Sequence, residues 1–126
     1  QVLLPLLNGD WAQAFLTIAQ GGIPSLEWRS LYASCVVLAA EGYPQNVVSG
    51  TVIEGDVLAQ TTSSYVLHAG AKKENGQWVV SGGRVLNCVG MGSSLKEAVK
   101  KAYDISETLQ WKGRQMRSDI GKKFLS

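Results

Sequence analysis

Apolar positions along the chain fall into two helical stripes, one near each end, with strand-like runs between them. Residues 9–20 place apolar side chains three and four positions apart, which is typical of a helix with one apolar face. Asp10 is suited to cap this helix, and Gly21-Gly22 ends it. The second helix is predicted over 94–110, where Ser94 opens a capping box and the apolar stripe is Leu95, Ala98, Val99, Ala102, Ile105 and Leu109.

The middle of the chain predicts β structure. Residues 31–40 (LYASCVVLAA) form a short apolar run bounded by turn residues, which indicates a strand covered on both faces. Residues 64–81 indicate a hairpin, because Asn75-Gly76 separates two strand-like runs. Residues 84–92 (RVLNCVGMG) predict a third strand, antiparallel to the second strand of that hairpin.

Two segments carry weaker patterns. Residues 45–64 are compatible with a short edge strand and a loop, and the tail from 110 onward predicts a short strand, a turn and one helical turn after Asp119. The sum is an α+β fold: a mostly antiparallel sheet with two main helices.

Composition narrows the class of protein. The chain has 126 residues, 45% of them hydrophobic and 17% charged, which is typical of one globular domain. No apolar stretch is long enough to cross a membrane, and the first residues lack the basic region of a signal peptide.

Cys35 and Cys88 both lie in apolar runs, so we expect free thiols and a cytoplasmic location. A single histidine makes a zinc site improbable. The absence of an initiator Met suggests a piece of a longer or processed chain.

Charge is concentrated at the C-terminal end. Residues 110–126 carry five basic side chains against Asp119, a net +4, so the first 109 residues sum to −2 of the total of +2. A local positive charge of this kind favours a local anion. A nucleic-acid site is not indicated, because it would need a broader basic stripe with interleaved aromatic residues.

Gly82-Gly83-Arg84 is the first candidate anion site. Glycines allow close backbone approach and expose N–H groups, and an arginine offers a planar cationic fork for phosphate or carboxylate. The plainer alternative is a glycine bulge between two strands, with a solvent-exposed arginine. From the local sequence alone this alternative is favoured, because a glycine pair is a weak motif.

The basic tail is the second candidate. Arg114 and Arg117 are three residues apart, so one helical turn would place them on the same face, with Asp119 bracing a guanidinium. The alternative is a solvated basic terminus. His68, at the end of a strand, and Tyr43, in the turn after 31–40, are compatible with a substrate contact or with a purely structural role.

Together these segments resemble one family. "CVVLAAEGYP", "VLHAGAKKENGQWVVSGGRVLNCVGMGSSLKEAVKKAY" and "WKGRQMRSDIG" occur in the order and at the spacing found in the C-terminal domain of phosphoribosylamine–glycine ligase, or glycinamide ribonucleotide synthetase. The resemblance covers nearly the whole chain, and Gln1 is similar to the end of the family's Asp-Pro-Glu-x-Gln segment.

The resemblance implies an ATP-grasp ligase of purine biosynthesis that joins glycine to 5-phosphoribosylamine through a glycyl phosphate. It implies that ATP and Mg²⁺ (or Mn²⁺) bind mainly in a preceding ATP-grasp region, so that this chain alone contains no catalytic or metal-binding residue and is inactive. Residues 1–22 would connect from that region, and 31–126 would form the core of a single C-terminal domain.

The resemblance also implies which residues contact the sugar-phosphate substrate. Gly82, Gly83 and Arg84 would form one wall of a phosphate pocket, and Arg117 with Asp119 would form a second wall. His68 and Tyr43 are secondary candidates, because Ala71 and Gln45 depart from the family pattern beside them.

Three alternatives remain at this point. One is a non-catalytic module that binds a sugar phosphate, and a second is an interaction domain whose apolar N-terminal face packs on a partner. A third is the C-terminal domain of another purine-pathway ATP-grasp enzyme. No nucleic-acid or membrane partner is expected.

Overall fold

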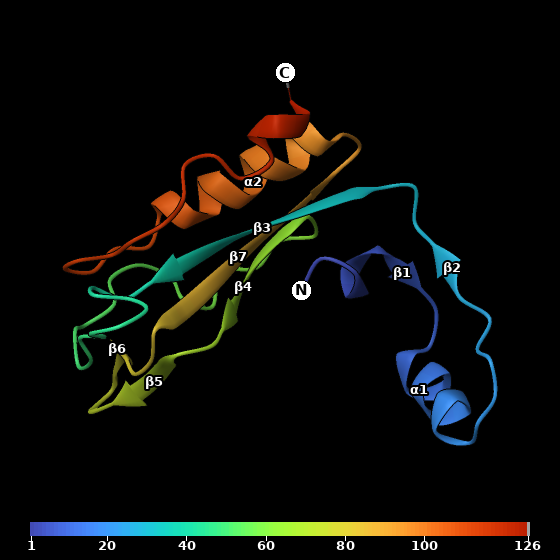
Figure 1. Ribbon diagram of the computed structural model, residues 1–126, viewed down its shortest axis with the longest axis horizontal. Coiled ribbons are helices and arrows are strands. Elements are labelled where there is room, and N and C mark those ends of the chain that lie inside the picture. Colours follow the sequence, from blue (N-terminus) through green and yellow to red (C-terminus); the bar gives the residue numbers. More distant parts are fainter. Residues whose placement is uncertain (126) are drawn as a thin grey trace.

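A three-stranded antiparallel sheet forms the centre of the fold, in a computed structural model that describes residues 1–125. Its strands lie in the order β3 (Tyr32–Ala39), β7 (Arg84–Gly92) and β4 (Ser64–His68). Helix α2 (Leu95–Glu107) covers one face of this sheet (Figure 1). The α+β class predicted from the sequence is therefore confirmed.

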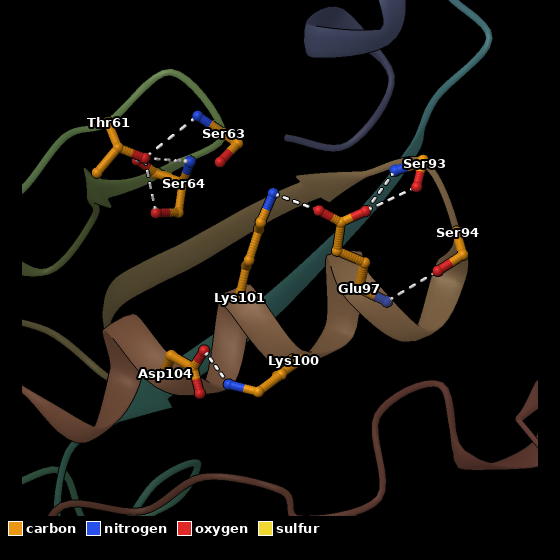
Figure 2. Close-up of polar contacts among 9 residues, drawn as sticks. All are labelled: Thr61, Ser63, Ser64, Ser93, Ser94, Glu97, Lys100, Lys101 and Asp104. Atoms are coloured by element: carbon orange, nitrogen blue, oxygen red, sulfur yellow. Dashed lines mark hydrogen bonds and ion pairs between the residues drawn. The ribbon is translucent and has the colours of Figure 1, made fainter.

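The predicted capping residues start α2, but the return hydrogen bond to Glu97 comes from Ser93 rather than from the N-cap Ser94 (Figure 2). Ser94 Oγ accepts a hydrogen bond from the Glu97 N–H at 3.2 Å. The Glu97 carboxylate accepts one from the Ser93 N–H at 2.8 Å and pairs with Lys101 Nζ at 2.8 Å. The hydrogen bonds from Lys101, foremost, and from Ser93 lower the pKa of Glu97 to about 2. These contacts fix the first turn of the helix before its apolar stripe meets the sheet.

Helix α2 packs closely on β7 because one strand position has no side chain. A Cβ atom at Gly90 would lie 2.3 Å from the carbonyl oxygen of Ala98 and 2.5 Å from the nitrogen of Ala102. Small residues on both elements thus let the backbones approach. The core built around this contact contains Val36, Leu38, Ala40, Ile53, Val57, Val80, Val85, Leu86, Cys88, Ala102, Ile105, Leu109 and Trp111.

Strand β3 forms where predicted, but its second face is only partly covered. Its residues alternate between buried and half-buried from Ser34 to Val37, so Cys35 and Val37 keep some exposure. Only the face toward α2 is fully packed. The expectation of a strand covered on both faces is therefore wrong for the described residues.

The predicted hairpin is divided into two sheets. Asn75-Gly76 does turn the chain between β5 (Ala71–Glu74) and β6 (Gln77–Val80), and Asn75 has a φ of 48°. The first predicted strand, however, breaks at Ala69-Gly70, and β4 joins the central sheet instead. The expectation that the third strand pairs with the hairpin's second strand is wrong, since β7 pairs with β3 and β4.

Two segments without a clear pattern contain isolated bridges rather than strands. In 45–64, Val52 bridges to Val79 and Glu54 bridges to Gln110, so the predicted edge strand is not formed. The predicted strand in the tail is likewise reduced to the bridges of Gln110 and Gln115. The last helical turn does form, as the 3₁₀ helix η2 (Lys122–Phe124).

An N-terminal arm begins beside β3, where Cys35 Sγ donates to Gln1 Oε1 at 3.5 Å, and runs on to α1, which lies apart from the central sheet (Figure 1). It contains the 3₁₀ helix η1 (Leu4–Leu6), a two-stranded pair of β1 (Leu7–Asn8) with β2 (Glu27–Trp28), and helix α1 (Trp11–Ala19). Asp10 caps α1 as predicted, accepting a hydrogen bond from the Gln13 N–H at 3.0 Å. The apolar stripe of α1 is only partly buried: Ala14 is buried, whereas the large side chains Phe15 and Ile18 are each more than half exposed.

The buried part of the domain is nearly free of unpaired polar atoms. Among residues 1–125, the Trp111 Nε1 is the one side-chain nitrogen or oxygen that is fully enclosed and has no hydrogen-bond partner, and nothing in the structure explains it. Cys35 and Cys88 are free thiols, as predicted. No helix in the described part of the chain is both long and apolar enough to cross a membrane.

Candidate functional site

The candidate site lies at one end of the central sheet. Because β7 is antiparallel to both neighbours, its first residue, Arg84, lies beside the ends of β3 and β4. The segments that leave those two strands, with Tyr43 after β3 and Ala69-Gly70 after β4, therefore meet the Gly82-Gly83-Arg84 turn. Strand pairing thus brings to Arg84 two segments that lie about 15 and about 40 positions before it in the sequence.

Backbone hydrogen bonds hold the Gly82-Gly83-Arg84 turn on both sides. The Ala40 N–H donates to the Gly83 carbonyl at 2.9 Å, and the Gly70 N–H donates to the Arg84 carbonyl at 2.7 Å. Among the described residues, the N–H groups of Gly82 and Gly83 have no hydrogen-bond acceptor. The turn thus offers two unpaired donors held in a fixed backbone.

Close approach, not positive φ, explains the two glycines. Neither Gly82 nor Gly83 has a positive φ, contrary to a common use of glycine. A Cβ atom at Gly70 would lie 2.7 Å from the Gly82 Cα, and one at Gly83 would lie 2.5 Å from Cδ2 of Tyr43. Gly82 therefore packs against the backbone after β4, while Gly83 makes room for an aromatic ring.

A β-bulge turns Arg84 toward this site. Leu38 pairs with Leu86, but the next residue, Ala39, pairs with Arg84, so Val85 is the extra residue of β7. Val85 and Leu86 are consecutive and both fully buried in the core. Without the bulge, Arg84 would share the face of Leu86 and point toward α2. The bulge thus lies at Val85 rather than at the glycine pair, and it is what orients the arginine.

A pocket of about 500 Å³ opens at this turn. Ala69 and Gly70 line it from the end of β4, and the other lining residues are Gln1, Tyr43, Gly83, Arg84 and Asn87. The Arg84 guanidinium makes no hydrogen bond or ion pair with any other residue in 1–125, so it is available to a ligand. We call this hollow the first pocket.

A second pocket, of about 410 Å³, adjoins the first and shares Tyr43 and Arg84 with it. Its other lining residues come from β3 and the tail, and they include Arg117. The tail reaches this end of the sheet because Gln115 bridges to Ala39. Arg84 and Arg117, 33 positions apart, therefore line one hollow.

Arg117 is held by Asp119, as the tail motif suggested. Its Nε donates to Oδ1 of Asp119 at 2.8 Å, and its Nη2 donates to Oδ2 at 2.5 Å. This pairing raises the pKa of Arg117 and lowers the pKa of Asp119. Both side chains are exposed, so the pair is an orienting contact rather than a source of much stability. The outer edge of the guanidinium, including Nη1, stays free among the described residues.

Two other candidates lie apart from these pockets. His68 Nε2 lies 2.7 Å from the carbonyl oxygen of Val57, and its ring packs edge-on against Trp78. Arg114 does not share a helical face with Arg117: it donates to the carbonyl oxygens of Ser106, in the last turn of α2, and Leu109, just after the helix, at 2.6 and 2.8 Å. Arg114 therefore satisfies a helix end.

Asn87 lines the first pocket but was not identified from the sequence. The available signal was its position as the single strongly polar side chain after Arg84 in the run RVLNCVGMG of 84–92. Within 1–125, no three His, Cys, Asp or Glu side chains gather in a way that would hold a metal ion. The site is thus built from two arginines, backbone N–H groups and neutral polar groups, which suits an anionic, polar ligand.

Comparison with known proteins gives a consistent result. A family model described as "Phosphoribosylglycinamide synthetase, C domain" matches residues 33–123. The phosphoribosylamine–glycine ligase of Caulobacter vibrioides is 40% identical over 99% of this chain and 30% of its own length. A bifunctional purine biosynthetic protein purD of Dictyostelium discoideum is 35% identical over the whole chain and 16% of its own length.

A solved structure is also similar. The crystal structure of phosphoribosylamine–glycine ligase from Thermotoga maritima matches with a TM-score of 0.80 and 34% identity, over 94% of this chain and 29% of that chain. The chain thus spans less than a third of the length of these relatives. The resemblance drawn from its motifs is confirmed, and the chain belongs to the phosphoribosylglycinamide synthetase family, in which it corresponds to the C domain.

Proposed function

We propose that this chain is the substrate-side C-terminal domain of a phosphoribosylamine–glycine ligase. The intact protein would join glycine to 5-phosphoribosylamine with ATP hydrolysis in purine biosynthesis, in the cytoplasm. ATP and Mg²⁺ (or Mn²⁺) would bind mainly in the region that precedes this domain in the relatives. The observation that carries the proposal is the convergence of Arg84 and Arg117 on one hollow in a chain of this family.

The chemistry of the pocket supports a phosphate ligand. Arg84 has no carboxylate partner among the described residues, and Arg117 keeps one guanidinium edge free beside Asp119. The unpaired N–H groups of Gly82 and Gly83 add two neutral donors. A dianionic phosphate is the ligand that best uses two cations and two backbone donors. Tyr43, packed on Gly83, would cover the bound substrate.

The N-terminal arm supports a preceding domain in the same polypeptide. The family model begins at residue 33, so the arm lies outside the C domain itself. Its helix exposes Phe15 and Ile18, and Ile23 in the loop after it is 95% exposed. The match to the Thermotoga maritima ligase, whose chain is much longer, covers 94% of this chain. We place the preceding ATP-grasp region against these apolar side chains, which otherwise form a surface unusual for a monomer.

Kinetics of the full-length protein test the proposal. Arg84→Ala and Arg117→Ala should each raise the KM for phosphoribosylamine and leave the KM for ATP nearly unchanged. Loss of one charge-assisted phosphate contact costs about 1.5–3 kcal/mol, or roughly 10- to 150-fold in affinity. Lys96→Ala, on the exposed side of α2, is the matched control, because Lys96 lines neither pocket.

Two results would contradict the proposal. One is a variant of Arg84 whose only defect is in nucleotide binding. The other is ATP-dependent ligation by purified residues 1–126, since the nucleotide site is placed outside this chain. A full-length protein without ligase activity whose C domain still binds sugar phosphates would favour a pure binding module.

A further inference from the structure

Asn87 is a buried polar side chain without a partner. It is 3% exposed, and its amide makes no hydrogen bond with any residue in 1–125. Its direct neighbours across the sheet are Val37 on β3 and Leu67 on β4, and both are apolar. Buried polar groups in native proteins are nearly always hydrogen-bonded, and each exception needs an explanation.

The open side of Asn87 faces the first pocket. The amide atoms are not sealed from solvent, since Trp111 Nε1 is the one fully enclosed and unpaired side-chain nitrogen or oxygen found in the described chain. The same bulge that turns Arg84 away from the core places it on the pocket side with Asn87. An unpaired amide and an unpaired guanidinium therefore line a single hollow of about 500 Å³.

The spacing of the two side chains suggests a ligand with two different ends. Asn87 follows Arg84 by three positions, which is roughly 10 Å along a regular strand. If Arg84 and the glycine N–H groups hold the phosphate of a ligand, the rest of that ligand can extend along β7 and lie beside Asn87. An amide both donates and accepts hydrogen bonds without charge, which suits hydroxyl groups better than a second anion.

We propose that Asn87 is a substrate-binding residue that hydrogen-bonds the sugar hydroxyls of a phosphorylated ribose held at Arg84. This inference rests on the proposed phosphate site and adds the group that distinguishes a ribose phosphate from phosphate alone. The amide is left unpaired in the free protein, and the ligand supplies its partners.

Calorimetry on the full-length protein tests this, with ribose 5-phosphate and inorganic phosphate as two separate probes. Asn87→Leu should weaken ribose 5-phosphate binding about tenfold and leave phosphate binding unchanged, since one hydrogen-bonding group is lost. Arg84→Ala should weaken both probes. Thermal unfolding should show Asn87→Leu to be at least as stable as the unchanged protein, because it replaces an unpaired amide by an apolar side chain between Val37 and Leu67. Asn87→Ala should show the same selectivity if leucine is too large.

The possible failures are distinct. Equal affinity of the Asn87→Leu and unchanged proteins for ribose 5-phosphate would overturn the sugar contact while leaving the phosphate site standing. Equal weakening of both probes would assign Asn87 to the phosphate instead and also overturn the inference. Marked destabilisation by both Asn87 substitutions would indicate a structural partner outside this chain. Binding of neither probe by the unchanged protein would refute the proposed function together with this inference.

Discussion

Tyr43, which lines both pockets, packs against Gly83, which lines the first: a Cβ atom at Gly83 would lie 2.5 Å from Cδ2 of the Tyr43 ring. Position 83 therefore has to be a glycine, because a larger residue would clash with the ring of Tyr43 from the loop after β3. The contact connects the end of β3 to the start of β7, and it lies where Arg84 enters the site.

Gly83→Ala should impair sugar-phosphate binding more than folding. The added methyl group would push the Tyr43 ring aside, and overpacking costs about 1–3 kcal/mol in a closed core. The cost should fall at or below the low end of this range, because Tyr43 is 40% exposed and its ring has room to move. We expect a small change in melting temperature and about tenfold weaker ribose 5-phosphate binding to the full-length protein.

A double-mutant cycle separates the clash from other effects. In a Tyr43→Ala background the same Gly83→Ala change should cost almost nothing further, because no ring remains to be displaced. Additive effects of the two substitutions would show that the contact does not govern binding.

Arg114→Ala should lower stability, whereas Arg117→Ala should weaken substrate binding. Arg114 donates to two carbonyl oxygens at the C-terminal end of α2, and its side chain is 12% exposed. Its loss should lower the free energy of unfolding by about 1.5–3 kcal/mol, the usual range for a charged hydrogen bond. Arg117 is exposed, so its replacement should change stability by less than about 1 kcal/mol and act on substrate binding instead. Urea denaturation of both variants measures the difference; equal destabilisation would refute it.

Glu97 should make stability depend on acidic pH. Its pKa is lowered from 4.5 to about 2 in the folded protein by hydrogen bonds from Lys101 and Ser93. The unfolded chain therefore binds more protons between these values, and the stabilising effect is complete above pH 4.5 and lost as the pH falls toward 2. Glu97→Gln removes this titration. The stability difference between the two proteins should shrink on acidification across this window, measured by urea unfolding at each pH; a difference independent of pH would contradict the assignment.

The two thiols should differ in reactivity. Burial raises the pKa of Cys88 to about 12, and burial also raises the pKa of the half-buried Cys35. In the folded protein at pH 8, iodoacetamide should leave Cys88 unmodified and label Cys35 slowly, because the thiolate is the reactive form. After denaturation under non-reducing conditions both should be labelled. Mass spectrometry of the modified peptides distinguishes the two sites, and a denatured protein that takes up no label would reveal a disulfide.

Local sequence determined the elements that depend on neighbouring residues. Asp10 and Ser94 start α1 and α2 because each cap is a contact to a residue three positions later. Asn75-Gly76 determined the β5–β6 turn through its need for positive φ. The ion pair of Arg117 and Asp119 was likewise determined locally, because the two residues are only two positions apart.

Tertiary structure decided what depends on distant residues. The sequence did not reveal that β4 and β7 are partners, because strand pairing is set by packing against α2 rather than by proximity along the chain. It did not reveal the contacts of His68, which are with Val57 and Trp78. The bulge at Val85 decided which way Arg84 faces, since one added residue reverses the side-chain alternation. The role inferred for Asn87 likewise follows from the apolar partners on either side of it, which only the sheet register supplies.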